Sequence, residues 1–186
     1  PPTDRWGLQN DLYSFVKCGE IPFDDYLYFL KYFQKEDVSL PLVSIASNLS
    51  EAYRVLSEPC REKISMLAGP WYESILDRIG LVPTSEDKHT TAILREQLIW
   101  DAVQYGSEAS VRCALEQFEL LKAGGSVHPD LLKSAMQVSA WTGNKQTLNW
   151  FSHRLQTSEV EHERMNILLA LGCFRQRPLI EAVREY

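Results

Sequence analysis

The hydrophobic residues of this 186-residue chain recur at intervals of three and four, which is the period of an amphipathic α-helix. In the first segment the apolar positions are Leu8, Leu12, Phe15 and Val16, and they predict a helix that buries this stripe and stops at Gly19. Prolines and glycines mark further starts and stops along the chain. More helices are predicted over about 23–33, 41–56, 59–79, 93–103, 111–121, 129–138, 148–155, 165–171 and 178–186.

One of these predicted helices contains two residues that disfavour a continuous helix. Gly69 and Pro70 lie within the apolar pattern of residues 59–79, and proline removes a backbone donor from the helix interior. We therefore expect a kink or a break there. No segment alternates with period two between hairpin turns, so the sequence predicts an all-α fold without strands.

The polar stretch 81–88 suggests a division of the chain. It separates a four-helix part, residues 1–80, from a helical-repeat part, residues 89–186. In the second part the helices pair at a spacing of roughly 30–35 residues, which is typical of stacked helical repeats. Because the sequence ends at Tyr186 inside a helix of this series, we expect the array to continue or another domain to cover its end.

Composition excludes some partners. The formal net charge of −6 disfavours a nucleic-acid surface and an anionic membrane surface, and no apolar run approaches the roughly 20 residues that span a bilayer. The four cysteines, Cys18, Cys60, Cys113 and Cys173, are widely spaced and form no CxxC pair. They are predicted to be reduced thiols, which together with the lack of an export signature favours a cytoplasmic location.

No catalytic or metal-binding motif is present in the sequence. His162-Glu163 begins like a zinc-protease helix, but the position of the second histidine is Asn166, so one helix face cannot offer both ligands. The remaining histidines are isolated, and no phosphate-binding glycine loop or nucleophile elbow occurs. The sequence Asn48-Leu49-Ser50 fits the glycosylation pattern but lies inside a predicted helix, so we interpret it as chance.

Several short motifs, taken in order, resemble the C-terminal helical domain of the gluzincin aminopeptidases. The segment 4–11, with Asp4, Arg5, Leu8 and Asp11, is similar to the D-R-x-x-L-x-x-D opening of that domain. Further matches follow at Gly19-Glu20-Ile21, Leu30 through Glu36, Pro41 and Leu49, Leu94-Arg95 with Leu98, Ala102 and Gly106, and Ala170-Leu171-Gly172. The resemblance extends over essentially the whole chain.

This resemblance implies a function and a fold. The fold would be a HEAT-like α-solenoid, a superhelix of antiparallel helix pairs. Such a domain is non-catalytic: it packs against the catalytic domain of its own parent chain and walls the chamber that holds the peptide substrate. The parent would be a zinc metallopeptidase that removes N-terminal amino acids, with its zinc on an earlier domain and no cofactor in this part. The alternative is a free-standing α-solenoid that binds a protein or peptide on its concave face.

The same resemblance suggests a binding site. In the endoplasmic-reticulum members of the family, a tyrosine-lysine pair and a distant arginine hold the C-terminal carboxylate of a peptide. These positions correspond to Tyr53, Arg54 and Arg175. A phenol and two guanidinium groups are chemically suited to a carboxylate because they donate charge-assisted hydrogen bonds.

Overall fold

The structure is a computed structural model that describes residues 1–184, and within these residues it contains helices and no strand. The prediction of an all-α fold is therefore confirmed for the described residues. The α-helices are α1 (Pro2–Lys17), α2 (Phe23–Leu30), α3 (Ser39–Val55), α4 (Glu58–Ile79), α5 (His89–Gln104), α6 (Glu108–Lys122), α7 (Pro129–Trp141), α8 (Lys145–Thr157), α9 (Glu161–Leu171) and α10 (Arg177–Val183). A short 3-10 helix, η1 (Lys31–Phe33), follows α2. The predicted last helix was extended to Tyr186, which lies outside the described residues.

The chain forms two compact units. The first comprises Pro1–Gly80 and Thr84–Ser107, and the second comprises Leu81–Pro83 and Glu108–Tyr186. Helix α5 belongs to the first unit because it packs on α3 and α4. The division of the chain at 81–88 and the pairing of helices into a HEAT-like solenoid stay predictions.

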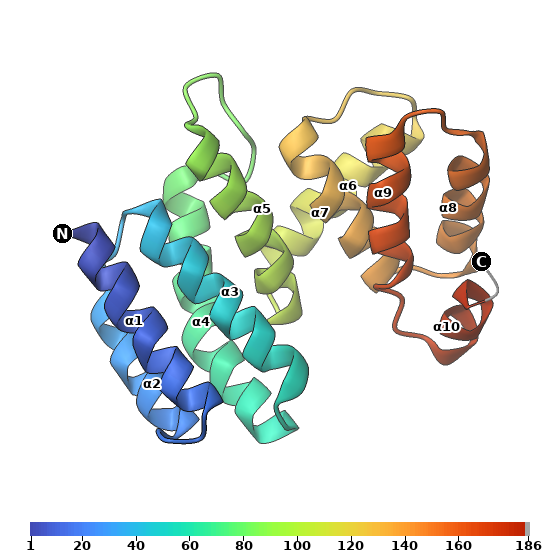
Figure 1. Ribbon diagram of the computed structural model, residues 1–186. Helices are drawn as coiled ribbons and strands as arrows, with labels where there is room; N and C mark the ends of the chain where they lie inside the picture. The colour runs from blue at the N-terminus through green and yellow to red at the C-terminus, as the bar shows by residue number, and fades with distance from the viewer. Residues whose placement is uncertain (185–186) are drawn as a thin grey trace. The chain divides into compact units, whose positions relative to one another are not determined.

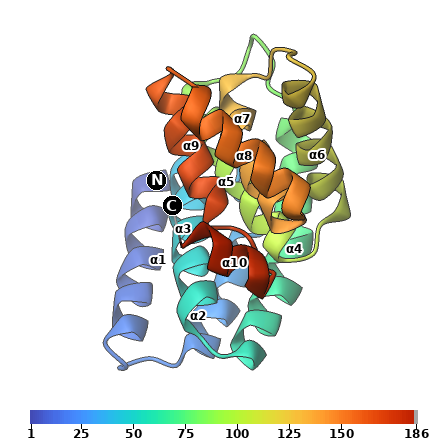
Figure 2. The same ribbon diagram turned by 90° about the vertical axis from the view of Figure 1, so that its right-hand side faces the viewer.

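In the first unit α3 lies between α1 and α5 (Figure 1). Helix α4 packs against α5 and α3, and α2 packs against α1. Figure 2 shows α1, α2, α3 and α4 again after a turn of 90° about the vertical axis. Fully buried side chains at the centre of this unit include Leu30, Ile45, Leu49, Ile64 and Leu98.

A buried polar network joins the first three helices. Gln9 is 0% exposed; it accepts hydrogen bonds from the Tyr26 hydroxyl at 3.0 Å and the Asn48 amide at 3.0 Å, and donates to the Ser44 hydroxyl at 2.9 Å. The Asn48 amide also donates to the Asn10 side chain at 3.2 Å. Because a buried polar group is costly unless it is paired, this network fixes how α1 sits on α2 and α3.

The predicted buried stripe of α1 holds only in part, because Leu12 and Val16 are partly buried but Leu8 and Phe15 are exposed. The buried residues of this helix are Gln9 and Tyr13, while Leu8 is 59% and Phe15 is 47% exposed. The hydrogen-bond network explains the difference, since it turns the Gln9 face of α1 toward α2 and α3. Periodicity alone selects the apolar face and cannot detect a polar residue that is buried with its partners.

Helix α4 runs through Gly69 and Pro70 without interruption, so the break allowed by the sequence does not occur. The interior proline is tolerated because the helix is held by its packing: Ile64, Ala68 and Trp71 are buried on one side. A Cβ at Gly69 would lie 3.6 Å from the Tyr105 carbonyl oxygen, so α4 approaches the end of α5 closely here. Since Pro70 has no N–H, the Met66 carbonyl lacks its usual donor four residues on.

The second unit is built around an apolar core. Helix α7 packs against α6 and α9, and α8 packs against α9 (Figure 1). The rings of Phe118, Trp150 and Phe151 contact one another, with centroids 5.0–5.5 Å apart. Apolar residues from α7, α8, α9 and α10 and from the segment between α9 and α10 complete the core: Ala135, Met136, Ala140, Leu148, Ile167, Ala170, Leu171, Phe174 and Leu179.

Candidate functional site

Tyr53, the first residue of the predicted carboxylate anchor, lies near the end of α3 and is partly buried. Its hydroxyl donates a hydrogen bond to the Gln104 carbonyl oxygen at 3.2 Å. Its ring contacts Tyr105, with centroids 5.1 Å apart, and the Arg61 guanidinium lies 5.8 Å from its centroid. Tyr53 thus satisfies a carbonyl at the C-terminal end of α5, where main-chain acceptors lack helical partners. A bound carboxylate would have to replace the Gln104 carbonyl as the acceptor of this hydrogen bond.

Arg54 follows on the same helix and is exposed. Within the described residues, no hydrogen bond or ion pair engages its guanidinium, and its main-chain oxygen accepts a hydrogen bond from Arg61 at 3.5 Å. All five guanidinium donors of Arg54 are therefore available to an anion.

Arg175 lies in the second unit, between α9 and α10, and is exposed. Its guanidinium stacks on the Trp141 ring, 4.4 Å from the centroid. The neighbouring Gln176 amide donates to the Gly143 carbonyl at 3.3 Å, which ties this segment to the turn after α7. Stacking orients the Arg175 side chain and leaves its in-plane donors open.

The structure thus places Tyr53 and Arg54 next to each other in the first unit, whereas Arg175 belongs to the second. The two arginines have the free donors that a carboxylate needs, but Tyr53 already has a structural partner. The assembly of the three residues into one site stays a prediction.

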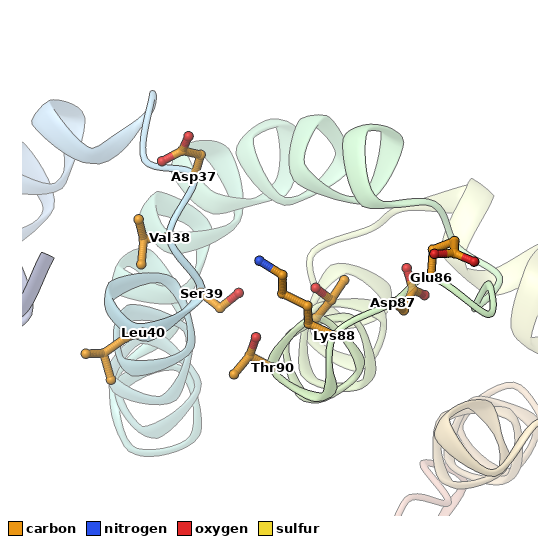
Figure 3. A pocket seen from close by; sticks show the side chains of 9 residues that line it. Asp37, Val38, Ser39, Leu40, Glu86, Asp87, Lys88 and Thr90 are labelled. Carbon is orange, nitrogen blue, oxygen red and sulfur yellow. The ribbon is translucent and has the colours of Figure 1, made fainter.

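A polar pocket in the first unit was not anticipated from the sequence. Residues 37–40, at the start of α3, and residues 86–88, 90 and 91, at the start of α5, line a cavity of about 540 Å³ (Figure 3). The Lys88 amine extends toward segment 37–40, and Ser39 and Thr90 contribute hydroxyls. Asp37 and Glu86 add negative charge, so the lining carries both signs. The sequence showed only a polar linker, because the partner segment lies about fifty residues earlier in the chain.

A buried ion pair holds the wall of this pocket. Arg95 is 0% exposed; it donates to the carbonyls of Ile79 and Gly80 at 2.9 and 2.7 Å and to the Asp87 carboxylate at 2.6 Å. A hydrogen bond from the Thr84 main-chain N–H, together with the one from Arg95, lowers the pKa of Asp87. Arg95 therefore closes the C-terminal end of α4 and fixes the segment that follows it.

A second ion pair joins two of the sequence motifs. Arg5 donates to both carboxylate oxygens of Glu36, at 2.5 and 2.8 Å, and the Val38 main-chain N–H donates to the same carboxylate. The hydrogen bond from Arg5 is the main cause of the lowered pKa of Glu36. Arg5, Glu36 and Arg95, all of which belong to the motifs quoted above, thus have structural roles.

The residues of the incomplete zinc motif do not form a metal site. The Asn166 amide nitrogen lies 3.3 Å from His162 Nε2, one helical turn away. Glu163 is buried and receives hydrogen bonds from Arg154 at 2.6 Å and from Ser158. Glu163 thus connects α9 to α8 through Arg154. Among residues 1–184, no group of three histidine, cysteine or acidic side chains is arranged to hold a metal ion. Residues 1–184 also include no helix that is both long and apolar enough to cross a bilayer.

These features define a helical domain whose charged motif residues stabilise the fold. The whole chain, residues 1–186, matches the family described as ERAP1-like C-terminal domain, and the chain belongs to this family.

Curated relatives agree with this assignment. The chain is 26% identical to tricorn protease-interacting factor F2 of Thermoplasma volcanium over 91% of its own length, and 20% identical to the puromycin-sensitive aminopeptidase of Caenorhabditis elegans over 100%. It is 22% identical to aminopeptidase M1-A of Oryza sativa over 91% of its length. In each case the match spans 20% of the relative, so the chain corresponds to one part of a longer protein.

Proposed function

We propose that this chain is the non-catalytic C-terminal domain of a zinc aminopeptidase, where it packs against the catalytic domain and walls the peptide chamber. The observation that carries the proposal is the match of all 186 residues to a C-terminal domain family whose curated relatives include aminopeptidases. The motif residues Arg5, Glu36 and Arg95 support it, because they pair within the fold and contribute no reactive group.

The parent protein would remove the N-terminal amino acid from peptides. Zinc supplies Lewis-acid activation of the scissile carbonyl and of water in such enzymes. The donor set of this chain does not fit that metal, since Asn166 occupies the position of a second histidine and bonds to His162. The zinc ligands would therefore belong to an earlier part of the parent chain.

The proposal is tested on the natural gene product. We would sequence the reading frame upstream of Pro1 and assay the full-length protein for bound zinc and for hydrolysis of an aminoacyl-coumarin. An upstream H-E-x-x-H motif with zinc-dependent activity would support the proposal. A metal-free, inactive full-length protein would contradict it and favour the free-standing α-solenoid that binds a protein or peptide.

We further propose that Tyr53, Arg54 and Arg175 bind the C-terminal carboxylate of the peptide. The open donors of Arg54 and Arg175 support this role, and Trp141 pre-orients Arg175. Tyr53 would exchange its bond to Gln104 for one to the carboxylate.

This anchor makes a charge-specific prediction about substrates. In the full-length enzyme, Arg54→Met and Arg175→Met should raise KM for peptides with a free C-terminus by about tenfold, the typical effect of losing one charge-assisted hydrogen bond. Peptides with an amidated C-terminus should be unaffected. Arg177→Met, which removes a 90% exposed arginine two positions from Arg175, is the control. Equal effects on free and amidated peptides would contradict the anchor.

The cytoplasm is the compartment we propose for the parent. All four cysteines are free thiols. Burial raises the pKa of Cys173 to about 11, which keeps that thiol protonated and weakly reactive. The proposed partners are the catalytic domain of the parent chain and its peptide substrate, and neither nucleic acid nor membrane is among them.

A further inference from the structure

The side chain of Arg61 returns from α4 to the end of α3. Helix α3 ends at Val55, and α4 begins three residues later at Glu58. The Arg61 Nε–H donates a hydrogen bond to the Leu56 carbonyl at 3.1 Å, and Nη2 donates to the Arg54 carbonyl at 3.5 Å. Main-chain acceptors in the last turn of a helix lack helical donors, so Arg61 fastens the end of α3 to the beginning of α4.

Arg61 also contacts the aromatic ring of the proposed carboxylate anchor. Its guanidinium lies 5.8 Å from the ring centroid of Tyr53, within the range of a cation–π interaction. Tyr105, at the end of α5, packs against the same ring at an interplanar angle of 62°. The Tyr53 ring therefore has two neighbours besides Gln104, which accepts the hydrogen bond of its hydroxyl. The hydroxyl can change its acceptor while the ring keeps its place.

The remaining nitrogen of Arg61 faces a carboxylate of its own helix. Nη1 lies 3.6 Å from the carboxylate of Glu58, three residues earlier. All three guanidinium nitrogens of Arg61 thus have partners, whereas the guanidinium of Arg54 is exposed and has none within residues 1–184. The two arginines are therefore suited to different tasks: Arg54 has donors for an anion, and Arg61 holds the main chain from which Arg54 extends.

A carboxylate anchor needs the Tyr53 hydroxyl and the Arg54 guanidinium to reach one ligand together. A side chain or turn that becomes ordered only on binding weakens affinity, because its conformational entropy is lost at that moment. Arg61 reduces this loss, since it contacts the Tyr53 ring and the Arg54 carbonyl in the free protein. The planar guanidinium reaches both carbonyls at the end of α3 at once, which a lysine ammonium cannot do in the same geometry.

We propose that Arg61 is a positioning residue of the carboxylate anchor, which holds Tyr53 and Arg54 in place for the C-terminus of the peptide. It acts through these two residues and makes no bond to the peptide itself. The inference rests on the function proposed above, because Arg61 has this role only if Tyr53 and Arg54 bind a carboxylate.

The experiment compares two forms of one substrate in the full-length protein. KM and kcat are measured for the best substrate of a panel of N-terminally varied peptides, with its C-terminus free and amidated. Arg61→Met should raise the ratio of KM for the free peptide to KM for the amidated peptide about fivefold, because Tyr53 and Arg54 then become ordered only on binding. The effect should lie in KM rather than kcat, since Arg61 is distant in role from the scissile bond. An unchanged KM ratio would overturn the proposal.

Arg78→Met is the matched control for a loss of stability. Arg78 lies on the same helix and donates to a main-chain carbonyl, that of Glu36, at 3.1 Å. Within residues 1–184 none of its interactions involves Tyr53 or Arg54. Arg78→Met should therefore destabilise the fold, measured by urea denaturation, without changing the KM ratio. Equal changes of the KM ratio in the Arg61→Met and Arg78→Met variants would overturn the proposal.

Arg61→Lys separates geometry from charge, and it carries the test if Arg61→Met does not fold. Lysine keeps the positive charge but not the planar fork, so Arg61→Lys should change the KM ratio nearly as much as Arg61→Met. A wild-type KM ratio in the lysine variant would show that charge alone matters, which contradicts a positioning role.

Arg54→Met distinguishes the failure of this inference from the failure of the anchor. If Arg54→Met leaves the KM ratio unchanged, the anchor is absent and both proposals fall. If Arg54→Met raises the ratio and Arg61→Met does not, the anchor stands and the positioning role is wrong. In the Tyr53→Phe/Arg54→Met background, a further Arg61→Met should have no effect, because the groups it positions are gone. A full additional effect would mean that Arg61 binds the carboxylate directly and would overturn the proposal.

Discussion

The helices of the two units are held together by different kinds of interaction. In the first unit, polar side chains distant in sequence bind one another: Arg5 pairs with Glu36 across 31 residues, and Gln9 with Asn48 across 39. In the second unit, the core is a continuous apolar cluster, and the ion pair of the buried Glu163 joins it to the half-exposed Arg154 across only nine residues. The first unit therefore depends on specific partners, and the second depends mainly on volume.

The largest expected effect comes from Arg95 in the first unit. Arg95→Met removes a fully buried guanidinium, leaves the Ile79 and Gly80 carbonyls without their side-chain donor, and deprives Asp87 of its cationic partner. Breaking a buried ion pair in this way typically costs about 3–5 kcal/mol of unfolding free energy. Urea denaturation followed by circular dichroism measures the loss. A cost below about 1 kcal/mol would show that water replaces the arginine readily.

A smaller effect is expected from the polar network of α1. Gln9→Leu has nearly the same volume and suits an apolar core, but it leaves the Tyr26 hydroxyl without its acceptor and Asn48 with one fewer. We expect a loss of about 1–3 kcal/mol in the unfolding free energy, the cost of unpaired buried groups. The double variant Gln9→Leu with Tyr26→Phe should recover part of that loss. A stabilised single variant would contradict the view that the network orients α1.

The corresponding change in the second unit should cost less. Arg154→Met removes one donor to Glu163, but the Ser158 hydroxyl remains bonded to the same carboxylate and Arg154 is 47% exposed. We expect a loss of about 1 kcal/mol, measured by the same urea titration. If this loss equalled that of Arg95→Met, the contrast between the units would not hold.

Low pH should destabilise both units for the same reason. Burial opposes the charged form of Glu163, but hydrogen bonds from Arg154 and Ser158 outweigh it and lower the pKa of Glu163; Arg5 lowers that of Glu36. A carboxylate with a lowered folded pKa stabilises the fold above its unfolded pKa, about 4.3, and this contribution is lost as pH falls through the folded pKa. Unfolding free energy measured from pH 7 to pH 3 should therefore drop below about pH 4.5.

The Glu163→Gln and Glu36→Gln variants are the test of this assignment. Each should be less stable than the unchanged chain at pH 7 and should lose less on acidification. If the unfolding free energy of both variants falls with pH as steeply as that of the unchanged chain, other carboxylates cause the acid sensitivity.

The smallest expected change in unfolding free energy comes from an exposed ion pair on α10. Arg177 pairs with Glu181 one turn later on α10 and is 90% exposed. Arg177→Met should change the unfolding free energy by less than about 0.5 kcal/mol, as exposed helical pairs usually do. A larger change would mean that exposed ion pairs stabilise the second unit as much as buried ion pairs stabilise the first.

The same contrast explains what could be predicted from the sequence. Helix positions followed from apolar spacing and from punctuation by proline and glycine, because these are local signals. The buried face of α1 did not follow, since Gln9 is recognised as a core residue only when Tyr26 and Asn48 are known to meet it. The continuity of α4 through Pro70 likewise depends on tertiary packing.

For the candidate sites, the resemblance supplied Tyr53, Arg54 and Arg175, but the bond from Tyr53 to Gln104 joins residues 51 positions apart and has no sequence signal.

The position of Asn48 has a consequence for how the domain can be produced. Its amide nitrogen donates to Gln9 and Asn10 at the junction of α1 and α3, and the same nitrogen is the atom that a glycosyltransferase would modify in Asn48-Leu49-Ser50. A sugar attached during translocation would prevent α1 from closing on α3. Secretory expression would therefore divide the product into glycosylated chains that cannot complete the first unit and unmodified chains that can, whereas bacterial cytoplasmic expression would avoid the competition between modification and folding.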